Sequence, residues 1–182
     1  MEHSAEPRPV PAETRDWSFV LSGSCPECGW EMVSDAVGLR QRWDVTVGAW
    51  PQVPLRDGAD ARPDARTWSP LEYAAHTRDM IRLLGLRLAS MVDHHDPEFP
   101  GWDGDVANVV RRDWVADPRE LSEDLGRAAQ QTAEVLDSLT PELLERRGHR
   151  GDGMPFTVLS LWQYIDHDVE HHLWDVTGRP QH

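Results

Sequence analysis

The chain has 182 residues, a length that corresponds to one domain able to bury an ordinary hydrophobic core. Its 18 Lys and Arg against 32 Asp and Glu give a net charge of −14, which argues against nucleic acid or an anionic membrane as partner, because both attract basic surfaces. No stretch approaches the ~20 apolar residues that span a bilayer, and the N-terminus lacks the apolar core of a signal peptide, so we expect a cytoplasmic protein.

The N-terminal region, residues 1–16, is rich in Pro, Glu and Arg and has little apolar surface to offset its ordering entropy. We predict a flexible arm there and a single folded domain over residues 17–182. The two cysteines of the chain follow in the stretch Cys25-Pro26-Glu27-Cys28-Gly29. A zinc site with four thiolates is therefore excluded, and the pair forms a turn, a redox or disulfide pair, or part of a shared metal site.

Apolar residues recur at helical spacing in four long segments. The first runs from about residue 31 to residue 50, where prolines stop the pattern. The second begins at Ser69, which acts as N-cap, with Pro70 at the first helical position and Glu72 completing a capping box, and continues to about Val92. Three arginines are expected on its solvent face, and these are Arg78, Arg82 and Arg87.

The third helix is predicted from Asp117 to about Leu139, followed by a short segment that ends near residue 148. The last runs from residue 156 or 157 to Gly178, a residue suited to a left-handed C-cap. Pro and Gly mark the loops, which we place at residues 51–67, 93–116 and 148–156. With no convincing strand pattern, the sequence predicts an all-α four-helix bundle with long crossover loops.

The last predicted helix carries the densest group of metal-capable side chains. His167 with His171, and Asp168 with His172, form two pairs at i, i+4 spacing, and each pair projects from one face. At ~100° per residue, Asp168 and His172 fall at the edge of the apolar stripe, and His167 and His171 lie nearly opposite. We therefore predict that Asp168 and His172 face the bundle interior.

The other pair has three open interpretations. In the first, His167 and His171 are solvated surface residues, and in the second they form a dimer contact together with Tyr164 and Trp174. In the third, they contact the ligand side chains without binding the metal. A third ligand has to come from another helix, and His76 is the candidate because it lies on the flank of the apolar face of the second helix. The sequence thus predicts a metal site of His76, Asp168 and His172.

Two motifs resemble a known family. They are Trp68-Ser69-x-x-Glu72-Tyr73-x-x-His76 at the start of the second helix and His171-His172-Leu173-Trp174-Asp175-Val176 near the end of the last. The chain resembles the DinB-like metal-binding four-helix bundles, which include mycothiol-dependent maleylpyruvate isomerases and the bacillithiol and mycothiol S-transferases. The resemblance implies a DinB-type bundle over roughly residues 31–177. It also implies that His76, Asp168 and His172 hold one divalent ion, whereas a shift of one residue would select His167 and His171.

Two imidazoles and one carboxylate leave open coordination positions, as in catalytic rather than structural sites. This donor set suits Zn, with Ni or Fe(II) as other options, and we expect Zn. The resemblance implies that a low-molecular-weight thiol similar to mycothiol is activated for transfer to, or isomerisation of, an electrophilic small molecule. Metal-dependent hydrolysis, an Fe(II) oxygenase reaction and non-catalytic metal binding are the alternatives. We expect a homodimer, and four residues to line the electrophile pocket: Trp102, Arg111, Arg112 and Trp114.

Overall fold

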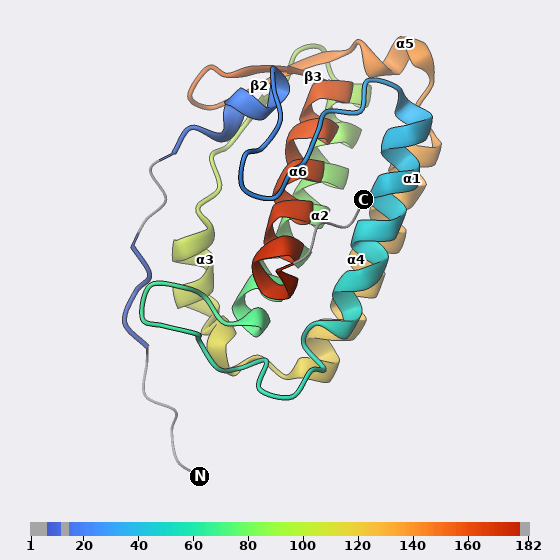
Figure 1. Ribbon diagram of the computed structural model, residues 1–182. Helices are drawn as coiled ribbons and strands as arrows, with labels where there is room; N and C mark the ends of the chain where they lie inside the picture. The colour runs from blue at the N-terminus through green and yellow to red at the C-terminus, as the bar shows by residue number, and fades with distance from the viewer. Residues whose placement is uncertain (1–6, 12–14, 179–182) are drawn as a thin grey trace.

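The computed structural model describes residues 7–11 and 15–178, and within them four long helices form the predicted bundle (Figure 1). The long helices are α1 (Ala36–Ala49), α2 (Pro70–Asp93), α4 (Pro118–Asp137) and α6 (Val158–Thr177). The shorter ones are α3 (Gly104–Arg111), α5 (Pro141–Leu144) and the 3-10 helices η1 (Trp17–Leu21), η2 (Trp50–Gln52) and η3 (Asp113–Val115). The predicted arm over residues 1–16 lies mostly outside the described residues and stays a prediction.

The ends of the long helices follow the capping residues in the sequence. The Ser69 hydroxyl accepts from the Glu72 backbone N–H at 3.2 Å, and a Glu72 carboxylate oxygen accepts from the Ser69 N–H at 2.9 Å, which confirms the capping box. Gly178, with φ of 64°, terminates α6 as predicted. Helix α1 begins about five residues later than expected because the Asp35 side chain caps it.

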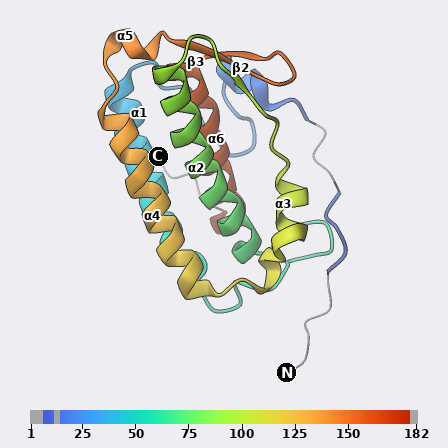
Figure 2. The same ribbon diagram turned by 180° about the vertical axis from the view of Figure 1, so that it is seen from behind.

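The bundle needs long connections because some neighbouring helices run in the same direction, so the chain has to return along the bundle between them. Helices α1 and α6 run in one direction and α2 and α4 in the other, as Figure 1 and the reverse view in Figure 2 show. Helix α2 packs against α4 and α6, and α1 packs against the same two helices, so α1 and α2 take diagonal positions. Residues 53–69 cross one end of the bundle, and residues 94–117 return along its length, as the predicted crossover loops require.

Aliphatic side chains and three tryptophans, Trp43, Trp50 and Trp162, contribute to the core between the four helices. Trp43 of α1 and Trp50 of η2 are fully buried, and the Trp50 indole N–H donates to the Val169 carbonyl of α6 at 3.2 Å. Burying side chains of this size supplies much of the driving force for folding. Among the described helices, none carries an apolar stretch long enough to cross a bilayer.

Two predicted loops contain secondary structure. Residues 93–116 include α3 and strand β1 (Glu98–Phe99), and residues 148–156 overlap the hairpin of β2 (Arg147–Arg150) and β3 (Pro155–Thr157). Strand β1 pairs parallel with β2, and β2 pairs antiparallel with β3, at the end of the bundle beside α5. The prediction of loops was wrong here because strands of two to four residues are too short to show a hydrophobic alternation.

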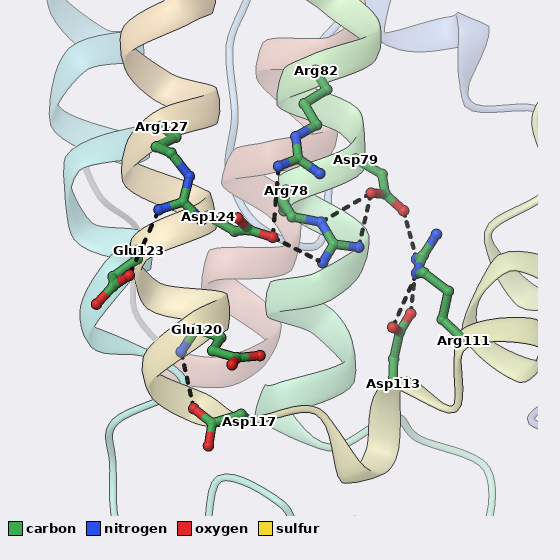
Figure 3. Close-up of polar contacts among 10 residues, drawn as sticks. All are labelled: Arg78, Asp79, Arg82, Arg111, Asp113, Asp117, Glu120, Glu123, Asp124 and Arg127. Atoms are coloured by element: carbon green, nitrogen blue, oxygen red, sulfur yellow. Dashed lines mark hydrogen bonds and ion pairs between the residues drawn. The ribbon is translucent and has the colours of Figure 1, made fainter.

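An ion-pair network joins α2 to its neighbours (Figure 3). Asp79 accepts from Arg78 at 3.0 Å and pairs with Arg111 at 2.6 Å, and Arg111 also pairs with Asp113 at 2.8 Å. Arg78 reaches Asp124 of α4 at 3.9 Å. The prediction that Arg78 faces solvent was wrong: its exposed fraction is 9%, because carboxylates from α4 and from its own helix compensate its charge.

Candidate metal centre

The start of α2 and the second half of α6 meet at one end of the bundle, and this contact brings His76, Asp168 and His172 together. Asp168 Oδ1 lies 3.4 Å from His76 Nε2 and 3.9 Å from His172 Nε2. The two imidazole rings are 4.8 Å apart between centroids and perpendicular at 89°. One donor atom from each residue lies within 4.8 Å of the other two. The three residues selected from the sequence therefore converge, while their role as ligands stays a prediction.

Asp175 orients the His172 ring by contacting Nδ1, the ring nitrogen that is not near Asp168. Its Oδ2 lies 2.9 Å from His172 Nδ1, and a carboxylate only accepts, so Nδ1 carries the proton. The lone pair of His172 then lies on Nε2, which faces Asp168. A carboxylate behind a histidine in this way fixes the ring of many metal ligands.

Several atoms at this point are buried without a hydrogen bond. They are Nδ1 and Nε2 of His76 and Oδ1 of Asp168. Buried polar atoms without a partner destabilise the fold, and a cation bound between His76 Nε2 and Asp168 Oδ1 would give both atoms a partner. The His76 ring is held between Trp68 and Trp102, with centroid distances of 5.3 and 5.2 Å. A Cβ at Gly104 would lie 2.7 Å from His76 Nδ1, so only glycine leaves room for this ring.

Asp168 is a carboxylate at neutral pH. Burial by itself raises its pKa, but the close contact with His76 at 3.4 Å and the charge of His172 outweigh burial and lower the pKa to about 2. A charged carboxylate and two imidazole nitrogens form a donor set that Zn, Ni and Fe(II) accept. These residues therefore fit a divalent ion.

A cavity of about 570 Å³ opens above this point. Its walls combine aromatic side chains with charged ones at the rim, and they include Arg15, Trp17, Glu27, Arg66, Trp68, Tyr73, Asp105, Tyr164 and Asp175. The Tyr73 ring lies 5.0 Å from that of His172, and burial together with Asp175 raises the pKa of the Tyr73 hydroxyl, which stays protonated. Within the described chain, the four residues predicted to line this pocket do not do so, because Trp102 packs on the His76 ring and Arg111 pairs with two aspartates.

Comparison with known proteins identifies the family. The model of the DinB superfamily matches residues 39–176, which is most of the chain. The chain belongs to the DinB superfamily. A solved structure of YfiT from Bacillus subtilis is 18% identical, with a TM-score of 0.68 over 86% of this chain and 91% of YfiT. YfiT is described as a probable metal-dependent hydrolase with an unusual four-helix bundle topology. No curated protein sequence matches this chain.

His167 and His171 are buried in this DinB bundle, so the interpretation as solvated surface residues was wrong. Neither is a surface residue, since their exposed fractions are 3% and 6%. Residues 17–30 cover that face of α6, and the Trp17 ring lies 5.4 Å from His167 and 4.8 Å from His171. The face proposed for a dimer contact is thus covered by the chain itself, and a homodimer stays a prediction without a defined surface.

The structure brings together the cysteine pair and the second histidine pair, which are far apart in the sequence. Cys25 and Cys28 are buried, and Cys25 Sγ lies 3.6 Å from His171 Nδ1. The signal in the sequence was a CxxC pair followed far along the chain by an HxxxH pair. Its two halves are separated by well over one hundred residues, so only the folded chain shows that they meet.

Proposed function

We propose that this DinB protein is a metal-dependent enzyme that activates a low-molecular-weight thiol, similar to mycothiol, for transfer to or isomerisation of an electrophilic small molecule. In this proposal His76, Asp168 and His172 hold one divalent ion, Zn in our expectation. The observation that carries it is the convergence of these three donors at the base of the 570 Å³ cavity. Three protein donors leave coordination positions open to a substrate, as catalytic sites require.

The bound ion would supply the Lewis acidity that lowers the pKa of a thiol and makes it a nucleophile at neutral pH. Asp168 contributes the negative charge of the site, and Asp175 keeps the proton of His172 on Nδ1. Tyr73 stays protonated beside His172 and can donate to an oxygen of the electrophile that gains charge. Arg66 at the rim can hold an anionic group of either substrate.

The cavity supports a reaction between two small molecules. A volume of 570 Å³ falls within the range of ~300 to 1,000 Å³ that holds drug-sized ligands, so it has room for a thiol beside a small electrophile. Trp17, Trp68 and Tyr164 make part of its wall apolar and can pack against apolar parts of the substrates. Both features suit a thiol placed beside an electrophile.

Hydrolysis is the second candidate, and the likeness in fold to YfiT favours it. The same three donors would then activate water, and the cavity would hold one larger substrate in place of a thiol and an electrophile. Dependence on an added thiol separates the two reactions, since a hydrolase turns over without one.

The test uses the zinc-loaded protein with N-acetylcysteine or mycothiol and an aromatic halide, and it follows thiol consumption. A parallel assay follows the cleavage of a nitrophenyl ester without thiol. We expect thiol consumption that His76→Ala and His172→Ala abolish. His94→Ala is the matched control, because His94 is an exposed histidine that follows the far end of α2.

Ester cleavage without thiol consumption would replace the first candidate by the second. Full activity in His76→Ala would contradict the proposed site for both reactions. Normal metal content with neither reaction across a panel of thiols and electrophiles would favour a non-catalytic metal-binding bundle.

A further inference from the structure

Residues 17–30 lie against the outer face of α6, where the blue segment passes beside the red helix in Figure 1. Four of their side chains form a small cluster separate from the bundle core: Val20, Cys25, Cys28 and Trp30. The cluster is small compared with the core, and a short segment gains little from burying so few apolar side chains. The contacts around the cysteines indicate what else holds this segment in place.

Four metal-capable donors converge inside this cluster. Cys25 and Cys28 come from the segment, and His167 and His171 come from consecutive turns of α6. One donor atom from each of the four lies within 4.8 Å of the other three, and all four residues are buried. The cysteines approach each other through a tight turn, in which the Gly29 N–H donates to the Cys25 carbonyl at 3.0 Å with Gly29 at φ of 78°.

We propose that Cys25, Cys28, His167 and His171 form a second metal site, a closed zinc site that fastens residues 17–30 to α6. Two thiolates and two imidazoles form a donor set that Zn prefers in tetrahedral structural sites. The spacing agrees as well: C-x-x-C places two sulfurs on one turn, and H-x-x-x-H places two imidazoles on one helical face. Four protein donors leave no position for a substrate, so the role of this site is structural.

The surroundings of the donors match those of bound ligands. His171 turns Nδ1 toward Cys25 Sγ at 3.6 Å and Nε2 toward the carboxylate of Glu27 at 3.6 Å, an arrangement in which one nitrogen is free for a metal and the other donates to a carboxylate. His167 Nε2 is buried without a hydrogen bond. Burial raises the pKa of the Cys28 thiol to about 12 although the Trp30 backbone N–H acts to lower it, so zinc binding at Cys28 would release the thiol proton.

A simple turn or a redox pair explains less of this geometry. A turn does not need two buried histidines beside the sulfurs, and a redox pair needs an accessible thiol, whereas Cys25 and Cys28 have exposed fractions of 1% and 2%. Packing alone would leave the His167 nitrogen unsatisfied. A metal ion accounts for both the convergence and the burial.

The second site shares no residue with the first and does not depend on the proposed function. His171 and His172 are adjacent in sequence, but His171 converges with the two cysteines and His172 converges with His76 and Asp168. One therefore belongs to the closed site and the other to the open one. Arg15, Trp17 and Glu27 form part of the cavity wall, so fixing the N-terminal segment would also shape the cavity.

Metal analysis of the full chain tests the proposal. Wild-type protein produced with zinc should hold two zinc ions per chain, Cys25→Ser/Cys28→Ser one, and His76→Ala one. His149→Ala, which changes a histidine on the small sheet, should hold two. Replacing zinc by cobalt gives the second readout, because thiolate ligands add a charge-transfer absorption in the near ultraviolet. We expect this absorption in wild type and in His76→Ala but not in the double serine variant.

Zinc content unchanged in Cys25→Ser/Cys28→Ser would overturn the proposal, as would a wild-type protein without the cobalt–thiolate absorption. A denatured wild-type protein that shows no free thiol would mean a disulfide and would also overturn it. If the double serine variant does not fold, the wild-type cobalt spectrum decides alone. Loss of activity in His76→Ala with the thiolate absorption retained would show that the two sites are independent.

Discussion

Asp175 should control how tightly His172 binds a metal. Asp175→Asn keeps the shape of the side chain but removes the charge 2.9 Å from His172 Nδ1, so the ring loses its fixed orientation and part of its basicity. We expect metal affinity at the open site to fall about 10- to 100-fold, as for other carboxylates behind a ligating histidine. Zinc titration against a competing chelator, in the double serine background, measures this site alone.

Asp96→Asn provides the matched control, because Asp96 faces His149 at 3.5 Å on the surface and belongs to neither site. Its zinc affinity should equal that of the parent protein. An equal loss in both variants would mean that the effect comes from net charge and not from the His172 contact.

Gly104 should be needed for the position of His76. A methyl group in Gly104→Ala would lie 2.7 Å from His76 Nδ1, which is closer than such atoms approach, so the imidazole has to move. We expect weaker metal binding at the open site without loss of the fold. Gly126→Ala on α4 is the control, since a Cβ there meets nothing within 4 Å. Metal affinity unchanged in Gly104→Ala would show that the ring position is not critical.

The helical phase of α6 predicted which residues turn toward His76 of α2 but not what covers the opposite face. Asp168 and His172 were selected because they border the apolar stripe, and they do meet His76. His167 and His171 were expected opposite that stripe, and they are buried because residues 17–30 lie over them. No periodicity in that segment indicates where it docks, since tertiary contacts alone place it.

At the level of helices, the network around Asp79 should be important for stability. Asp79 is nearly buried between Arg78 and Arg111 and links α2 to the last residue of α3 (Figure 3). Asp79→Ala leaves the Arg78 charge buried without its nearest partner, and breaking a buried pair in this way costs ~3 kcal/mol or more of the free energy of unfolding. Urea unfolding measures the change.

Arg127→Ala is the control within the same network. Its side chain is 58% exposed and pairs with Glu123 and Asp124 on the surface of α4, so its loss should change the free energy of unfolding by about 1 kcal/mol or less. A similar decrease in the free energy of unfolding in both variants would indicate that burial does not determine how much these ion pairs stabilise the fold.

The sequence predicted helices better than strands, for a local reason. Ser69, Asp117 and Thr157 mark helix starts through hydrogen bonds to backbone groups within three residues, so the signal is contained in a short stretch. The β1 to β3 sheet depends on pairing between Glu98 and His149, about fifty residues apart. Pairing at such separation leaves no trace in either strand alone.

At the scale of the whole molecule, the chain combines a bundle that its own core can hold with a segment that lies outside that core. The bundle core extends from α1 to α6, whereas residues 17–30 contribute to a separate, smaller cluster. The two parts meet across the second histidine pair. Metal removal should therefore act on them unequally.

We expect hydrogen exchange to reveal this difference. With zinc bound, the amides of residues 17–30 should be protected, because a ligand that binds only the docked state stabilises it by about 2.7 kcal/mol at one hundred times its dissociation constant. After chelation, these amides should exchange faster, while those in the centres of α2 and α4 keep their protection, since their packing does not involve the site. The double serine variant should behave like the chelated protein even with zinc present. Equal acceleration throughout the chain would instead show that segment and bundle unfold as one unit.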